Sequence, residues 1–236
     1  MKLEQIKILK GKITVKTGLH IGAGDTEMKI GGTDNPVIKH PWTMEPYIPG
    51  SSLKGKIRFL LEMKSGLIGK RQKKDGNPLT YNDLQIDELS DKDKKLAERI
   101  LKLFGGSGGD KEEKFLPARA IFRDCYINKD CKKAWKENNR PFTEIKVENR
   151  INRIKGTAEH PRHTERVVEG VEFDFEIALK IFEEDKNDNL EDLLLEGLKL
   201  LEYDYLGGSG SRGYGKVEIK IEEPKEIADK FQNLKI

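Results

Sequence analysis

Long apolar runs and cysteines are both scarce in this sequence of 236 residues. No stretch of 18 apolar residues occurs, and the start, Met1-Lys2-Leu3-Glu4, lacks an apolar signal region. The two cysteines, Cys125 and Cys131, cannot build the framework of several disulfides that is typical of small secreted domains. The sequence therefore excludes an apolar membrane-spanning helix, and it predicts a cytoplasmic protein without a membrane partner.

Net charge is also small, at +3, but charged residues make up 36% of the chain and are unevenly distributed. Residues 51–74 hold eight Lys and Arg against one Glu, and residues 132–166 hold ten against five Glu. Residues 172–204 carry twelve acidic residues against three Lys. This separation predicts one face that binds a polyanion and another face turned elsewhere. The alternative is a set of solvated helix faces, which suits the acidic block.

Hydrophobic periodicity predicts an α+β fold. Apolar residues alternate with polar ones in some segments and recur at helical spacing in others. Strands are expected at residues 5–17, 118–127, 171–182 and 214–222, and helices at about 51–65 and 190–202. The order strand, helix, strand, strand, helix, strand is that of a ferredoxin-like (RRM-like) unit. The chain lacks the aromatic RNP motif of nucleic-acid-binding sheets of this kind, so we expect loops to do any such binding.

Insertions interrupt this predicted core. We expect a single domain over residues 1–222, with insertions at about 22–48, 64–112 and 140–166, and a C-terminal tail over 223–236. The second insertion includes a helical pattern from about Ser90 to Phe104, which Gly105-Gly106 terminates. The third has isoleucine and valine between basic residues, which predicts a protruding basic β-hairpin arm with its tip or return between Gly156 and Pro161. The alternative is an edge strand kept soluble by its charge.

Two segments have the features of anion sites. The stretch from Gly207 to Val217 reads G-G-S-G-S-R-G-Y-G-K-V, and five of its first nine residues are glycine. Glycine lets a backbone approach a ligand closely and Arg212 adds a charge-assisted fork, so the stretch suits a phosphate chain. A flexible linker is the alternative.

The second segment begins at Gly50. Ser51 or Ser52 can cap a helix whose first turns carry Lys54, Lys56 and Arg58, and a helix N-terminus with nearby cations favours an anion. The segment superficially fits the phosphate-loop pattern G-x-x-x-x-G-K. However, Ile57 stands where magnesium binding needs Ser or Thr, which excludes an NTPase.

Three further features have competing structural explanations. His20 lies among apolar residues and glycines, where a histidine commonly packs without doing chemistry. Asp34, in Gly32-Thr33-Asp34-Asn35-Pro36, stands where Asp and Asn before Pro favour a turn. A zinc site is conceivable, but the spacings C-x5-C and H-x2-H are irregular, so we predict no bound metal. Its ligands would be Cys125, Cys131, His160 and His163.

The glycine-rich stretch resembles the C-terminal signature of RAMP proteins, the RNA-binding subunits of CRISPR effector complexes. Between Gly18 and Arg58, the stretches G-L-H-I-G-A-G-D, G-T-D-N-P-V-I and Y-I-P-G-S-S-L-K-G-K-I-R are similar to the backbone subunit of the type III-A (Csm) effector complex. The similarity continues through L-F-G, I-F-R-D and T-E-I-K-V-E-N-R-I. It covers most of the chain and is weakest at about 64–100 and after residue 222. It implies an RRM-like RAMP domain whose arm reaches over the guide RNA.

The resemblance also implies a function. Copies of the chain would stack along CRISPR RNA (crRNA), with other Csm subunits that include a related RAMP subunit at the crRNA 5′ end, and would cleave the paired single-stranded target RNA. Asp34 falls on the position of the family's cleaving aspartate, which implies a catalytic role. A divalent cation such as Mg²⁺ would be recruited with the RNA, without an organic cofactor. The residues expected to bind RNA are His20, Ser51, Ser52, Lys54, Lys56, Arg58, Arg123, Arg150, Arg153, Gly207, Gly208, Ser209, Gly210, Ser211, Arg212 and Gly213.

Two alternatives stay open. One is a non-catalytic RNA scaffold of the same architecture. The other is a stand-alone RAMP endoribonuclease that processes precursor crRNA, which an acid–base pair between His20 and a second group would favour. In the guided case, binding across many guide sequences requires that the protein read the RNA backbone and not the bases.

Overall fold

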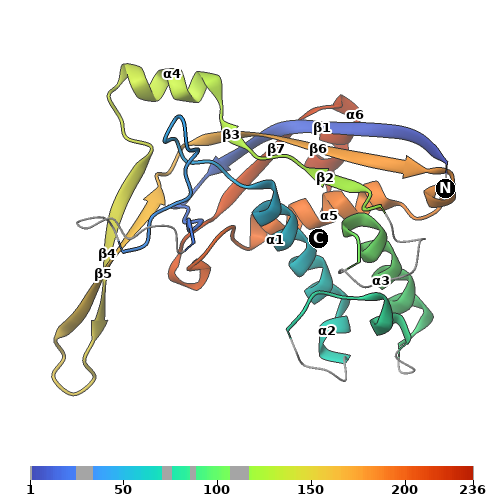
Figure 1. The fold of residues 1–236 in the computed structure, drawn as a ribbon, viewed down its shortest axis with the longest axis horizontal. Coiled ribbons are helices and arrows are strands. Elements are labelled where there is room, and N and C mark those ends of the chain that lie inside the picture. The colour runs from blue at the N-terminus through green and yellow to red at the C-terminus, as the bar shows by residue number, and fades with distance from the viewer. Residues whose placement is uncertain (1, 25–33, 71–75, 86–88, 107–116, 236) are drawn as a thin grey trace.

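A computed structural model describes residues 2–24, 34–70, 76–85, 89–106 and 117–235. It has strands and helices in mixed order (Figure 1). The strands are β1 Leu3–Val15, β2 Ala120–Phe122, β3 Tyr126–Ile127, β4 Thr143–Ile151, β5 Ala158–Val167, β6 Glu172–Phe182 and β7 Val217–Glu223. The helices are α1 Gly50–Ser65, α2 Leu67–Lys70, α3 Asp91–Phe104, α4 Lys129–Glu137, α5 Leu190–Tyr203 and α6 Lys225–Asn233, and the 3-10 turns are η1 Tyr81–Gln85, η3 Glu183–Asp185 and η4 Gly210–Arg212. No helix in these ranges is long and apolar enough to cross a membrane.

The main sheet is antiparallel, with strand order β2-β6-β1-β7 and with β3 also paired to β6. β1 runs beside β6 from Leu3 opposite Phe182 to Thr14 opposite Glu172. On its other side, β1 pairs with β7 from Lys10 opposite Glu223 to Val15 opposite Val217. The predicted strand at 171–182 and helix at 190–202 are thus present as β6 and α5, since both patterns were long and regular.

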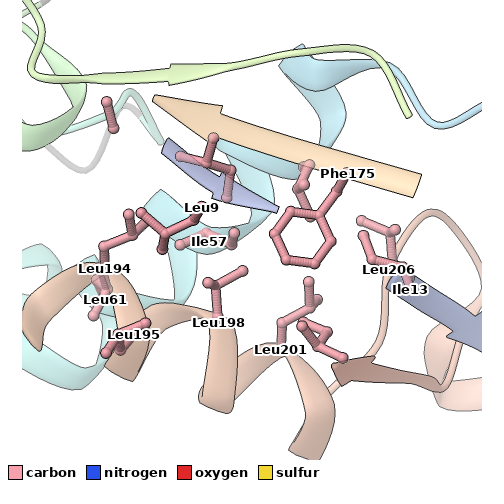
Figure 2. Packing of buried hydrophobic residues seen from close by; sticks show 14 of the residues in the cluster. Leu9, Ile13, Ile57, Leu61, Phe175, Leu194, Leu195, Leu198, Leu201 and Leu206 are labelled. Carbon is pink, nitrogen blue, oxygen red and sulfur yellow. The ribbon is translucent and has the colours of Figure 1, made fainter. Parts of the chain in front are cut away.

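Helices α1 and α5 lie against one face of this sheet (Figure 1). Period-2 alternation turns Leu9 and Ile13 of β1 and Phe175 of β6 to that face, where the leucines of α5 meet them (Figure 2). Ile57 and Leu61 of α1 complete the layer. The structure is therefore α+β with one continuous core between the sheet and two helices.

A helical lobe follows α1. Gly66 ends α1 in the left-handed conformation at φ 69°, as expected of a C-cap glycine. The expected helix at 90–104 is α3: Ser90 caps it by accepting from the Asp93 amide, and Gly105 follows its last residue. The lobe is fastened to α1 by Arg58, which pairs with the buried Glu62 at 2.7 Å and donates to the Leu79 and Gly105 carbonyls.

Strands β4 and β5 form a separate two-stranded sheet that projects away from the core (Figure 1). Its connection spans residues 152–157, so Gly156 lies at the tip and Pro161 lies in the returning strand β5, as expected of the tip or return of a hairpin. Asn152 forms the turn, because its side chain accepts from the amides of Ile154 and Lys155. On these strands, the side chains of Ile145, Val147 and Ile151 are at least half exposed.

Three expectations need correction. The strand predicted at 118–127 is two short strands, because Asp124 turns out of the ladder to accept from the Gly50 amide and Cys125 pairs with Ile48. The residue before α1 is Pro49, so neither Ser51 nor Ser52 caps the helix.

Residues 223–236 are more than a tail: α6 buries Ile227 and Phe231. Helix α4, which we did not predict, is capped by the Asn128 side chain.

Candidate nucleic-acid interface

The glycine-rich stretch packs closely against the segment after β1. The Gly208 amide donates to the His20 carbonyl at 2.8 Å, and the Gly215 amide donates to the Gly18 carbonyl at 3.1 Å. Gly207 has φ 77°, and a Cβ built on it would lie 2.2 Å from the His20 carbonyl oxygen. No side chain fits there, so glycine at 207 serves the close approach of two backbones.

His20 is the centre of this packing. Its Nδ1 lies 2.7 Å from the Glu165 carbonyl oxygen, and because a carbonyl only accepts, Nδ1 donates in this contact. Added Cβ atoms at Gly22 and Gly208 would lie 3.5 Å from Nε2 and 3.7 Å from Cδ2 of the ring. The half-buried imidazole is thus flanked by two glycines.

Helix α1 connects to the same stretch through Lys56. Its Nζ pairs with Asp204 at 2.7 Å and lies 3.6 Å from the centre of the Tyr205 ring. Tyr205 in turn packs so tightly on Gly210 that an added Cβ would lie 2.0 Å from the ring. Lys56 therefore orients the chain that enters the glycine-rich stretch.

Lys54 and Arg58, also on α1, have different environments. Lys54 forms no ion pair within the described ranges, and burial, followed by the nearby Arg58 charge, lowers the pKa of its amine. Arg58 is committed to the helical lobe, with a side chain only 12% exposed. Lys54 is thus available to an anion, whereas Arg58 already has a structural role.

Ser51 and Ser52 belong to the first turn of α1, and Arg123 directly follows β2. An added Cβ on Gly50 would lie 2.4 Å from the Phe122 carbonyl oxygen, so the first turn sits against the segment between β2 and β3. The Arg123 side chain is 60% exposed, with its Nε 3.8 Å from Glu176. Arg150 and Arg153 are exposed on the hairpin, apart from this group.

A polar cluster joins the hairpin base, which comprises residues 143–148 of β4 and 162–167 of β5, to the glycine-rich stretch. The Tyr214 hydroxyl donates to Glu148 at 2.9 Å, and Arg212 Nε lies 3.5 Å from the same carboxylate. Arg212 also donates to the Ser209 hydroxyl. Lys146 pairs with Glu148 and lies over the Tyr214 ring. Burial raises the pKa of the Glu148 carboxyl, but its hydrogen bond from Tyr214 and the cations outweigh burial and lower it, so Glu148 stays ionised.

Asp34 lies beside the hairpin base. Its Oδ2 accepts from the His163 amide at 3.0 Å, and His163 Nδ1 lies 3.6 Å away. The Asp34 side chain is 59% exposed and that of His163 is 50% exposed. A hydrogen-bonded carboxylate is thus open to solvent next to the segment that holds His20. Asp25, the other aspartate of the loop, lies outside the described residues.

The cysteines are core residues. Cys125 pairs with Ile48 through its backbone, and burial raises the pKa of its thiol to about 12. Burial also raises the pKa of the Cys131 thiol, whose sulfur accepts from the Glu172 amide. Within the part of the chain that the structure describes, no three His, Cys, Asp or Glu side chains gather in a way that could hold a metal ion.

Sequence reasoning missed the groups that hold this region together, chiefly Glu148, Glu165 and Tyr214. Glu165 offered one usable signal: it shares a strand face with the buried Val167, where alternation predicts an apolar residue. Tyr214 and Glu148 offered none, since they are 66 residues apart in the chain.

Comparison with known proteins gives a consistent result. A family model for the RAMP superfamily matches residues 12–218. A protein of Methanocaldococcus jannaschii named CRISPR system Cms endoribonuclease Csm3 is 42% identical over 236 residues, which cover 97% of this chain and 86% of that protein. A protein of the same name from Streptococcus thermophilus is 42% identical over 222 residues, covering 93% of this chain and 89% of that one.

A solved structure is similar as well. It is the crystal structure of a Csm3–Csm4 subcomplex in the type III-A CRISPR-Cas interference complex. The chain compared is 34% identical, with a TM-score of 0.53, over 93% of this chain and 78% of that chain.

Proposed function

Because the chain belongs to the RAMP superfamily and, within it, to the Csm3 family, we propose that it is an RNA-binding backbone subunit of a type III-A CRISPR effector complex that cleaves target RNA. Copies line a crRNA in a filament, together with other Csm subunits including a RAMP relative at the crRNA 5′ end, in the cytoplasm. One observation carries the proposal: the exposed Asp34 carboxylate accepts from the His163 amide on β5, the strand whose Glu165 carbonyl contacts His20.

Asp34 is the proposed catalytic residue. The 2′-hydroxyl oxygen of the target attacks the adjacent phosphorus, the bond to the 5′ oxygen breaks, and the products are a 2′,3′-cyclic phosphate and a 5′-hydroxyl. Asp34 would accept the 2′ proton, and the departing 5′ oxygen takes a proton from solvent. The guide backbone would be held by Lys54, Arg212 and amides of residues 207–213 other than those of Gly208, Arg212 and Gly213, which donate within the chain.

The chain alone does not fit a resident metal ion, because one exposed aspartate is a poor site by itself. We propose that a divalent cation is recruited jointly by Asp34 and RNA phosphates. When bound, it would stabilise the charge that develops on the phosphorus oxygens.

We also propose that the main sheet with α1 and α5 is a ferredoxin-like (RRM-like) unit and that the β4–β5 hairpin is a basic arm over the guide. The strand order β2-β6-β1-β7 supports the first assignment. The exposed Arg150, Arg153 and Lys155 near the hairpin tip support the second.

The RNA that co-purifies from the native host tests this function. A guided subunit should elute as a large complex with discrete short RNAs of uniform 5′ ends. A monomer that cuts precursor crRNA without a bound guide would identify the stand-alone nuclease. Guide-loaded complexes that never cut a matched target would identify the scaffold.

A further inference from the structure

A buried carboxylate joins the Asp34 segment to the hairpin. Glu165 of β5 is 7% exposed. Its Oε1 accepts from Lys39 Nζ at 2.6 Å, and its Oε2 accepts from the Val37 amide at 3.1 Å. Val37 and Lys39 follow Asp34 by three and five residues. One side chain therefore holds the backbone that leads away from Asp34.

The backbone of the same strand holds the segment a second time. The Glu165 amide donates to the Asn35 carbonyl at 3.0 Å, and the Asn35 amide donates to the His163 carbonyl at 3.3 Å. The Glu165 carbonyl accepts from His20 Nδ1 at 2.7 Å. Residue 165 thus contacts the Asp34 segment with its side chain and amide, and His20 with its carbonyl.

We infer that Glu165 is a positioning residue for RNA cleavage: it fixes the backbone that carries Asp34 beside His20 and the hairpin base. This inference rests on the proposed function. Since Asp34 itself is 59% exposed, the precision of its carboxylate depends on how firmly residues 35–39 are held. A misplacement of about 1 Å can cost about 100-fold in rate.

The environment of Glu165 fits this role better than a role in stability. Burial raises the pKa of its carboxyl, but hydrogen bonds from Lys39, Thr143 and the Val37 amide outweigh burial and lower it. The group is thus charged at neutral pH. A buried ion pair is a weak source of stability compared with apolar residues of similar volume, whereas it specifies geometry through directed hydrogen bonds.

The test uses the assembled, guide-loaded complex at saturating concentration, in excess over the target RNA. Glu165→Gln keeps one oxygen for the Val37 amide but loses the charged acceptor for Lys39. We expect unchanged guide loading and target affinity and a single-turnover cleavage rate lowered about 10- to 100-fold. Glu191→Gln is the matched control, because Glu191 of α5 is also a mostly buried carboxylate that accepts from a lysine, Lys7 at 2.6 Å, and its described partners lie outside the Asp34 segment. It should cut at the wild-type rate.

Substitutions of Lys39 test the inference a second time, and they also test it if Glu165→Gln fails to assemble. Lys39→Met should slow cleavage without loss of target affinity, and the conservative Lys39→Arg should restore the rate. A wild-type rate in Lys39→Met, or equal losses of rate and affinity, would overturn the inference. Asp34→Ala is run in parallel. If it still cuts, the proposed function fails; if it is inactive while Glu165→Gln and Lys39→Met cut normally, only the positioning role fails.

Discussion

At the scale of single residues, two glycines of the same stretch have similar positive φ angles and different surroundings. Gly207 and Gly213 have φ 77° and 84°. An added Cβ at 207 would lie 2.2 Å from the His20 carbonyl, whereas at 213 it meets nothing within 4 Å. Substitutions at these two positions therefore separate the free-energy cost of backbone strain from the cost of disturbing a close contact.

We predict that Gly213→Ala costs only the strain of a left-handed alanine, about 1 kcal/mol in the free energy of unfolding. Gly207→Ala should cost clearly more and weaken RNA binding, because the stretch must move away from His20. Denaturant unfolding and RNA titration of both variants measure this. Equal losses in the two would mean that the approach to His20 is not needed.

The basic residues of α1 allow a second comparison. Lys54→Ala should leave stability unchanged, weaken RNA binding for every guide sequence, and reduce the slope of log affinity against log salt by about one. Arg58→Ala should mainly destabilise the protein, by about 3 kcal/mol, because Glu62 is then buried without its partner. An Lys54→Ala effect confined to one guide would contradict backbone reading.

At the scale of elements, the sequence predicted what local patterns determine. β6 alternates from Glu172 to Ile177, and α3 has both its Ser90 cap and its terminal glycine in the sequence. The break between β2 and β3 could not be predicted, because it depends on the Gly50 amide 74 residues away from Asp124. α4 is short and mostly polar, with Cys131 as its buried residue. Its hydrophobic pattern was therefore too weak to predict a helix.

The candidate site follows the same rule. The glycine-rich stretch was found through its local pattern and Asp34 through the family resemblance, since the residues around Asp34 by themselves favour a turn. Glu165 was not found, because Lys39 and the Val37 amide lie 126 and 128 residues earlier in the chain. Arg58 was assigned to RNA because the sequence showed its charge and its helix face but not the Leu79 and Gly105 carbonyls it serves.

The projecting hairpin gives the prediction at this scale. Replacing Arg150–Glu159 by Asn-Gly removes the outer part while it keeps Glu148 and its bond to Tyr214. The protein should fold normally and fail to assemble along RNA in gel filtration. Two companion variants separate charge from apolar contact: Arg150→Gln with Arg153→Gln, and Ile151→Ser with Ile154→Ser. Normal assembly of the shortened protein along RNA would contradict the proposed role of the hairpin in assembly.

At the scale of the whole molecule, one buried ion pair ties the lobe to the sheet. Arg119 and Asp185 are both fully buried, with Arg119 Nε 2.9 Å from Asp185 Oδ2, and Lys102 of α3 lies 3.2 Å from Asp185. Burial raises the pKa of Asp185, but Arg119 and Lys102 outweigh burial and lower it. Its contribution to stability is therefore present above about pH 4, the value in the unfolded chain, and is lost as pH falls through the lower folded value.

We predict that Asp185→Asn lowers the free energy of unfolding by about 3–5 kcal/mol at neutral pH, since the buried Arg119 keeps only the more distant Glu184 carboxylate, at 3.9 Å, as a counter-charge. The variant should also lose less stability than the wild type on acidification below about pH 4. Asp188→Asn, which changes a carboxylate 20% exposed beside the same Lys102, should cost less. Denaturant unfolding across pH measures both, and equal costs would contradict the role of burial.

The central claim is that Asp34 cuts target RNA paired to a guide, and single-turnover cleavage by guide-loaded complexes tests it most directly. Asp34→Ala and Asp34→Asn should assemble and bind target normally but leave it uncut, whereas Asp25→Ala should cut at the wild-type rate. Wild-type products should end in a 2′,3′-cyclic phosphate, and EDTA should stop the reaction. Cleavage at the wild-type rate by assembled Asp34→Ala complexes would contradict the claim and leave the chain a scaffold.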